Sequence, residues 1–171
     1  MTDVDHFPSW SDPRALLAAP TPAHGRHALE CRAVSGPEEL ATHHVLRRQV
    51  FVDEQGLFQD DRDAHDDDPA TVHVLGFIDG MPAGTVRLYP IDRALWKGDR
   101  LAVQPAARRA GLGAPLVRYA VSTAACLGGR RMDAHVQLDN VSFFRRLGWT
   151  IVGDPALYVG RPHQAMTIAL A

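Results

Sequence analysis

The stretch "LAVQPAARRAGLGAPLVRYA", residues 101–120, joins a strand-like segment to a helix through a turn that carries two arginines and two glycines. Apolar residues recur at helical spacing from Leu112 to Leu127, and Gly128 and Gly129 end the pattern. The first backbone N–H groups of a helix have no partner within the helix, so such a turn can bind phosphate. The stretch therefore predicts a strand, a phosphate-binding turn and a helix, in that order.

Two better-known phosphate loops do not fit this turn. A Walker A loop needs Lys followed by Ser or Thr, but Ala114 and Pro115 follow Gly113. A dinucleotide fingerprint needs a third glycine early in a βαβ unit, whereas Leu116 stands at that place, past the middle of the chain. Two hypotheses remain: a pyrophosphate bound to the backbone at Gly111 and Gly113, and a tight turn that binds nothing.

The composition is that of one ordinary domain. The chain has 171 residues, of which 46% are hydrophobic and 22% charged, and its net charge of −2 gives no electrostatic case for nucleic acid. No apolar run approaches the roughly 20 residues that cross a bilayer, and no secretory leader is recognisable. Cys31 and Cys126 lack disulfide or metal spacing. We expect a cytoplasmic protein without nucleic-acid or membrane partners, and the sequence leaves a homodimer open.

The chain divides into a Pro/Ala-rich tail or arm, residues 1–27, and a domain, residues 28–171. The tail holds four prolines and shows little periodicity. The domain opens with a strand at 28–34 and a helix over 35–55, with Ser35 as N-cap candidate and Pro37 in the first turn. A turn-rich acidic loop follows at 56–70.

Strands and helices then alternate. An Asp-Gly turn joins two strands into a hairpin, and a short helix opened by Asp139 or Asn140 precedes the last two strands. The predicted strands are 71–80, 81–90, 95–104, 131–137, 149–153 and 162–170, and the helices after the hairpin are 112–127 and 139–148. This order predicts an α/β (α+β) layered domain around a mixed sheet.

Two motifs resemble those of the GCN5-related N-acetyltransferase (GNAT) superfamily. The segment "LAVQPAARRAGLG" (101–113) is similar to its acyl-CoA signature, Q/R-x-x-G-x-G/A, with Arg108, Gly111 and Gly113 at the fixed places. The segment "NVSFFRRLGW" (140–149) resembles its asparagine-to-"FYxxxGF" segment. The resemblance covers residues 28–170.

Other segments narrow the resemblance to small ElaA-like acetyltransferases. They are "LRRQVFVDEQ" (46–55), "HVLGFIDG" (73–80), "GTVRLYP" (84–90) and "PHQAM" (162–166). The Arg-x-x-Val-Phe and Arg-Leu-x-Pro patches are shared more distantly with acyl-homoserine lactone synthases. The chain also resembles an acetyltransferase subfamily found beside nitrilase genes in nitrogen-starvation clusters.

The resemblance implies a GNAT fold: a mixed, mostly antiparallel sheet of six to seven strands with helices on both faces. It implies acetyl-CoA as cosubstrate, with the pantetheine arm along 101–103, the Val103 amide as oxyanion donor and the pyrophosphate over 108–114. The residues expected to bind coenzyme A are Leu101, Ala102, Val103, Arg108, Arg109, Ala110, Gly111, Leu112, Gly113, Ala114, Asn140 and Phe143.

Acetyl transfer from a thioester to an amine needs a base for the amine and a proton for the leaving thiolate. In the family, the tyrosine of "FYxxxGF" gives that proton, but Phe144 stands there. Water, Tyr158 or Tyr89 are the alternatives. A non-catalytic acyl-CoA-binding or regulatory module is therefore the second function hypothesis.

Three residues are candidates for the base. Glu54 closes the first helix beside the acidic loop, a region that borders the acceptor pocket in ElaA-like proteins, and it is the first choice. His73 lies on the opposite strand face from its apolar neighbours, and His135 lies on the polar face of "RMDAHVQ". Each has a structural alternative: a solvated carboxylate for Glu54 and a hydrogen-bonded structural role for either histidine.

The acceptor, a small-molecule amine, is expected to meet Arg87, Tyr89 and Gln137. The alternative for Arg87 is a buried ion pair with Glu54 or with an aspartate of the acidic loop. His163 at the start of the last strand matches a histidine in the ElaA-like ending, where a structural role at the strand end is equally open. The acidic loop is either solvated or attracts a cationic amine.

No metal site is predicted. The run "DDRDAHDDD" (60–68) lacks the glycine and glutamate that a calcium loop requires if Asp61 is its first ligand. The histidines show no ligand spacing.

Overall fold

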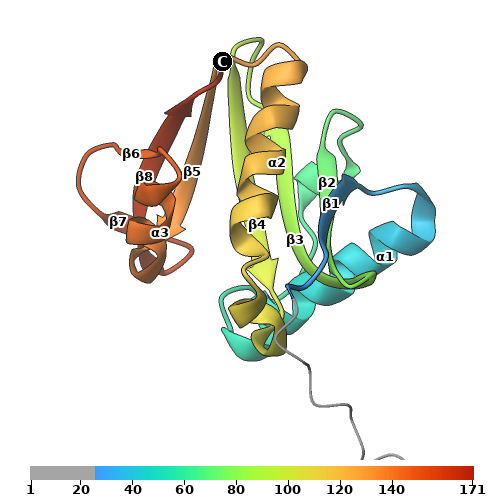
Figure 1. Ribbon diagram of the computed structural model, residues 1–171. Coiled ribbons are helices and arrows are strands. Elements are labelled where there is room, and N and C mark those ends of the chain that lie inside the picture. Colours follow the sequence, from blue (N-terminus) through green and yellow to red (C-terminus); the bar gives the residue numbers. More distant parts are fainter. Residues whose placement is uncertain (1–25) are drawn as a thin grey trace, which may run out of the picture.

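The computed structural model describes residues 26–171, so the predicted tail lies almost wholly outside the described residues. One sheet carries the strands in the order β1-β2-β3-β4-β5-β8-β6, and β7 also pairs with β8 (Figure 1). The strands are β1 Leu29–Ala33, β2 Val72–Ile78, β3 Met81–Pro90, β4 Leu95–Val103, β5 Arg131–Gln137, β6 Thr150–Ile151, β7 Ala156–Tyr158 and β8 Arg161–Ala169.

Three α-helices accompany the sheet: α1 Gly36–Arg47, α2 Gly113–Cys126 and α3 Val141–Arg146. Shorter helical segments are η2 Arg48–Glu54, η3 Ala64–Asp67, η4 Pro105–Ala110 and η5 Leu138–Asn140. None of the helices in the described residues could cross a membrane by its length and apolar character.

The predicted order of elements is confirmed. The sheet is mixed and mostly antiparallel, because β4 and β5 form its parallel pair. The sequence analysis missed β7, a strand of three residues that a two-residue turn at Val159 and Gly160 joins to β8. With β7 the described sheet has eight strands rather than the six or seven expected.

The first helix is longer than α1 alone. Its backbone continues from Arg47 into the π-helical segment η2 and ends beside Gln55, which matches the predicted range of 35–55. Pro37 lies in the first turn as predicted, but the side chain of Ser35 makes no capping hydrogen bond.

Helices α1 and α2 cover opposite faces of the sheet (Figure 1). On the α1 face, Leu46 packs against Leu75 of β2. On the α2 face, the fully buried side chains of Leu112 and Leu116 lie against a cross-strand glycine pair, Gly76 of β2 and Gly84 of β3. A Cβ at Gly84 would lie 2.9 Å from Leu116 Cδ1, so both glycines let the helix approach the sheet closely.

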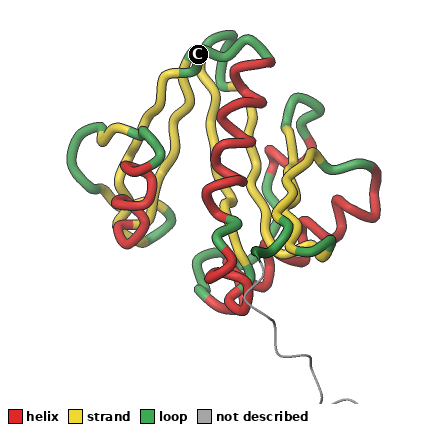
Figure 2. Tube along the Cα trace, viewed as in Figure 1, coloured by secondary structure: helices red, strands yellow, loops and turns green. Residues whose placement is uncertain are grey.

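The neighbouring strands β4 and β5 part after a short parallel ladder. They pair over three residue pairs, of which Lys97 with Asp133 is the last, and Figure 2 shows them diverging beyond it. A bulge on the other edge of β4 sets Arg100 and Leu101 opposite the single residue Val86, with a positive φ of 52° at Arg100. The sheet is therefore split at its centre, and this split positions the site.

A buried ion-pair network fills the α1 face. The guanidinium groups of Arg47 and Arg87 have no exposed surface. Arg87 donates hydrogen bonds to Asp63, Asp66 and Asp99 at 2.6–2.9 Å, and Arg47 donates to Asp66 at 2.6 and 3.0 Å. Burial alone would raise the pKa of Asp66, but hydrogen bonds from His73 and Arg47 hold it below its usual range.

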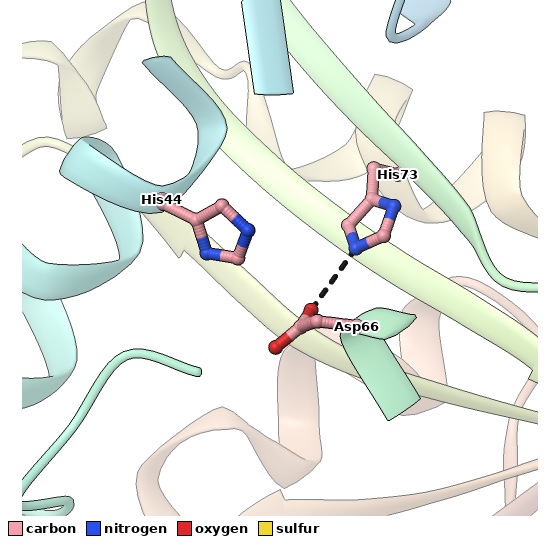
Figure 3. A group of neighbouring side chains, drawn as sticks. All are labelled: His44, Asp66 and His73. Atoms are coloured by element: carbon pink, nitrogen blue, oxygen red, sulfur yellow. Dashed lines mark hydrogen bonds and ion pairs between the residues drawn. The ribbon is translucent and has the colours of Figure 1, made fainter. Parts of the chain in front are cut away.

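Histidines lie beside this network. Figure 3 shows His44 of α1, Asp66 of η3 and His73 of β2 pointing toward one another, with His73 Nε2 at 3.0 Å from Asp66 Oδ1. A metal ion held by these three side chains would lie next to the Arg47 and Arg87 cations, which already share the Asp66 carboxylate. The arrangement therefore favours an ion-pair network over a metal centre.

We expect acid to destabilise the fold through His43. Burial, followed by the nearby His73 and Arg47, lowers the pKa of His43 to about 3, whereas an unfolded histidine titrates near 6.5. The unfolded chain then binds a proton that the folded chain excludes, so stability falls as the pH drops below about 6.5. The loss from this one group is about 2 kcal/mol at pH 5.

Urea unfolding at pH 7, 6 and 5 measures this loss. His43→Gln keeps a donor for the Val86 carbonyl and does not titrate, so its stability should fall less over this range. The aspartates whose pKa is lowered, such as Asp63, contribute only below about pH 4 and leave this window clear. If the free energy of unfolding fell equally with pH in the wild-type and His43→Gln proteins, the role of His43 would be contradicted.

Candidate functional site

The cleft lies where β4 and β5 part. The end of the first helix and its loop cover one side of it, α2 and α3 the other, and β7 and β8 close its far edge. It is lined by Phe51, Leu57, Phe58, Val86, Gly98, Asp99, Arg100, Leu101, Val117, Ala120, Met132, Ala134, His135, Val136, Gln137, Asn140, Phe144, Trp149, Tyr158 and His163.

The β4 segment predicted to hold the pantetheine arm borders this cleft. Leu101 lines it, while Ala102 is buried against Val50 and Phe51 on the α1 face. On one edge of β4, Ala102 and Val103 pair with β3. On the other edge, which faces β5, β4 has no strand partner beyond Lys97 within the described sheet. A strand edge without a partner can bind an extended chain through its backbone.

The glycine turn has the geometry expected of a phosphate site. Segment η4 ends at Gly111 in the left-handed conformation, φ 83°, and α2 begins at Gly113 without a side-chain cap. A Cβ at Gly111 would meet nothing within 4 Å, so this glycine serves the backbone conformation rather than packing. Leu112 is fully buried, so only its backbone can face a ligand.

Arg108 and Glu54 form an ion pair. Arg108 Nη2 donates to Glu54 Oε2 at 2.6 Å, and Arg108 Nε donates to the Val103 carbonyl at 3.2 Å. This hydrogen bond from Arg108 lowers the pKa of Glu54, and a carboxylate with a lowered pKa is a weaker base. Glu54 does not line the cleft, so its predicted base role requires Arg108 to release it.

The remaining residues predicted to bind coenzyme A surround the same turn. Asn140 lines the cleft at the start of α3. The Phe143 ring packs close to Gly113, where a Cβ would lie 3.4 Å from its Cζ. Arg109 is exposed, and Ala110 and Ala114 are partly exposed.

Arg87 and Tyr89 do not take the acceptor positions predicted for them. The Arg87 guanidinium group donates its hydrogen bonds to aspartates of the protein itself. Neither Arg87 nor Tyr89 lines the cleft. The alternative of a buried ion pair describes Arg87, with Asp63 and Asp66 of the acidic loop rather than Glu54 as partners. The Tyr89 ring stacks on His65 at 3.9 Å.

The acidic loop is solvated only in part, because Asp60, Asp67 and Asp68 are exposed whereas its other three aspartates are not. Asp61, Asp63 and Asp66 turn inward to His44, Arg87 and Arg47. His73, a predicted base, bonds Asp66 within the same network and does not line the cleft.

His135 and Gln137 do lie in the cleft, as predicted. The Gln137 side chain donates to Gln55 Oε1 at 3.0 Å, which ties the end of the first helix to β5. His135 Nδ1 lies 2.6 Å from Lys97 Nζ, and its ring stacks on Tyr158 at 4.4 Å between centroids. His163 meets the same Tyr158 ring edge-on at 5.3 Å.

The sequence analysis missed Lys97, Asp99 and Arg100. Lys97 and Asp99 alternate with the buried positions Trp96 and Gly98, so a period of two could have placed both on the opposite strand face, where Asp99 lines the cleft and Lys97 contacts His135. The bulge that turns Arg100 into the cleft had no signal in the sequence.

Comparison with known proteins agrees with this geometry. The sequence model of the "Acetyltransferase (GNAT) family" matches residues 39–149. A Bacillus subtilis (strain 168) protein named as an acetyltransferase is 26% identical over 141 residues, which cover 81% of this chain and 95% of that protein.

Solved structures share the fold. An N-acetyltransferase from Lactobacillus plantarum superposes with a TM-score of 0.75 at 25% identity, covering 84% of this chain and 99% of the other. Escherichia coli ElaA gives a TM-score of 0.73 at 22% identity, covering 82% and 99%. The acyl-homoserine lactone synthase BjaI gives 0.71 at 22% identity, with 84% of each chain covered. The predicted resemblance to the GNAT superfamily, to ElaA and to acyl-homoserine lactone synthases is confirmed, and the resemblance to the nitrilase-associated subfamily stays a prediction.

Gly113→Ala tests the phosphate site. The added methyl contacts Phe143 at an ordinary 3.4 Å and favours the helix, so the fold should be retained, but it stands where a pyrophosphate would approach the backbone. We expect the Kd for coenzyme A to rise at least about tenfold, measured by calorimetry, with an unchanged melting temperature. Arg109→Ala is the control, with a smaller loss. Unchanged affinity in Gly113→Ala would place the pyrophosphate elsewhere.

Proposed function

The chain belongs to the acetyltransferase (GNAT) family, and on this premise we propose that it transfers an acetyl group from acetyl-CoA to the amine of a small molecule. The reaction proposed is direct attack of the amine on the thioester in a ternary complex. A cytoplasmic location stays a prediction from the sequence.

One observation carries this proposal: the parting of β4 and β5 with the glycine turn at its open end. Only the short segment η4 separates this turn from the end of β4, so a pyrophosphate held there would direct the pantetheine arm back between the two strands. The thioester at the end of the arm would then lie near the point where the strands meet. The imidazole groups of His135 and His163 and the amide of Gln137 line the cleft there, and the Lys97 ammonium group contacts His135 from outside the lining.

Direct transfer is supported by the positions of the cysteines. Neither Cys31 nor Cys126 lines the cleft, and burial raises the pKa of Cys31 to about 11, which disfavours a thiolate. A covalent acyl-enzyme through either thiol is therefore not proposed.

Phe144 favours a second candidate function, a non-catalytic acyl-CoA-binding or regulatory module. Its ring is buried in the cleft wall against Trp149 and carries no proton for the thiolate. An acetyltransferase would turn over acetyl-CoA, whereas a regulatory module would bind it without turnover.

Release of thiol from acetyl-CoA decides between them. We expect the protein to release free thiol above background with at least one member of a panel of amines and amino acids, and to bind coenzyme A. Mass spectrometry of the amine should show one added acetyl group. Binding without thiol release across the whole panel would favour the regulatory module.

Glu54→Gln tests the base predicted from the sequence. Because Glu54 is held by Arg108 outside the cleft, we expect the substitution to free Arg108, to tighten coenzyme A binding by a few fold, and to leave kcat within about threefold. Steady-state kinetics with the best amine measures both. A loss of kcat by about 10²-fold that shrinks as pH rises would instead make Glu54 the base.

A further inference from the structure

Two histidines face the cleft, and the Nδ1 atom of each is engaged, in one as a donor and in the other as an acceptor. His163 and His135 both line it, on adjacent strands β8 and β5, and both contact the ring of Tyr158. Which nitrogen of a neutral histidine carries the proton is set by the partner that the other nitrogen has. The inference below rests on the proposed function.

His163 is fixed by a backbone carbonyl. Its Nδ1 lies 2.9 Å from the Arg161 carbonyl oxygen, which can only accept a hydrogen bond, so Nδ1 carries the proton. The Nε2 atom of a neutral His163 then has a lone pair. The side chain is buried in the cleft wall, 4% exposed, so this lone pair is held in a defined position.

His135 is fixed in the opposite way. Its Nδ1 lies 2.6 Å from the Lys97 ammonium group, which can only donate, so Nδ1 accepts and Nε2 carries the proton. Burial, followed by the charges of Lys97 and His163, lowers the pKa of His135, so the ring is neutral at pH 7. The nearby Asp133 carboxylate raises the pKa of His135, but its effect is smaller than those three.

The position of each ring matches a different step. His135 stands two residues beyond Asp133, the last residue of β5 that pairs with β4, and therefore where the strands begin to part. The end of a pantetheine arm directed back from the glycine turn would reach this place. His163 pairs with Gln137, nearer the open end of the cleft.

We propose that His163 accepts the proton of the attacking amine at Nε2, and that His135 gives the Nε2 proton to the leaving thiolate. The amine nitrogen bonds the carbonyl carbon, the carbon–sulfur bond breaks, and the sulfur takes the proton from His135. Lys97 acts through His135 as a positioning residue, and its Nζ replaces the proton at Nδ1. To restore the starting state, His135 takes a proton from solvent at Nε2 and returns the Nδ1 proton to Lys97, and His163 loses the amine proton to solvent.

Lys97 enables His135 to donate a proton to the thiolate. A neutral imidazole alone gives up its proton reluctantly, but the coupled transfer from Lys97 makes the ammonium group the true acid. Burial lowers the pKa of Lys97 from its ordinary value of 10.5, which brings it toward the thiol's value of about 8.5. The pair thus supplies the proton that Phe144 cannot.

Nitrogen-15 NMR of the histidine rings tests the assignment without any turnover. At neutral pH we expect His135 protonated at Nε2 and His163 protonated at Nδ1, with signals assigned from the His135→Asn and His163→Asn proteins. Lys97→Met should let the His135 proton distribute over both nitrogens, whereas Lys97→Arg should keep it at Nε2. A proton at Nδ1 of His135 or at Nε2 of His163 would overturn the proposal.

Kinetics tests the two roles separately. The asparagine amide can replace the Nδ1 contacts to Arg161 or Lys97 but has no atom at the place of Nε2. Both variants should therefore fold, bind coenzyme A normally and lose at least about 10²-fold in kcat. The loss in His163→Asn should shrink as pH rises toward the pKa of the amine, and the loss in His135→Asn should not. His27→Asn, at an exposed ion pair with Asp79, is the matched control.

The outcomes separate this inference from the proposed function. A wild-type protein that binds coenzyme A but releases no thiol with any amine would overturn the proposed function and the catalytic roles with it. An active wild-type protein whose His135→Asn and His163→Asn forms keep full turnover would overturn only the histidine assignment.

Discussion

Two buried guanidinium groups are the constraint on which the structure depends. Arg47 and Arg87 have no contact with solvent, and a buried charge without a partner costs several kcal/mol. Asp63 and Asp66 of the acidic loop and Asp99 of β4 meet that demand by accepting charge-assisted hydrogen bonds from the two guanidinium groups. The loop therefore cannot lie elsewhere while the two arginines stay buried.

The same constraint shapes the cleft. Asp63 also binds Arg100 at 2.7 Å, and the Arg100 guanidinium lies 4.0 Å above the Phe58 ring. Arg100, Phe58 and Asp99 all line the cleft, so the network reaches its wall directly. The bulge at Arg100 places this side chain there at the cost of a left-handed backbone, and such strain persists only where its surroundings hold it.

Regular features of the sequence predicted most of the fold and the cofactor side of the site. Apolar residues recur at helical spacing over 112–127, the Asp79-Gly80 turn indicates a hairpin, and Gly111 adopts a left-handed conformation. Each of these features is local in the sequence, so local patterns were enough to predict them. The sequence alone offers an ion pair between Arg87 and the acidic loop only as an alternative, because the partners of Asp61, Asp63 and Asp66 are distant in sequence. Arg87 was read correctly as a cation needing a partner, but the register that brings Asp99 opposite it is a property of the folded sheet.

The histidines show most clearly what sequence patterns leave open. His73, His135 and His163 all lie on strands and carry the same ring, yet one bonds a buried aspartate, one accepts from a lysine and one donates to a carbonyl. Alternation along a strand can assign a face to each ring, but it cannot assign a proton to a nitrogen. That choice depends on the group opposite Nδ1 or Nε2, and here those groups come from another strand, from the segment η3 and from the start of the histidine's own strand. A proton donor and a proton acceptor can therefore be built from one residue type, because the fold rather than the side chain sets the difference.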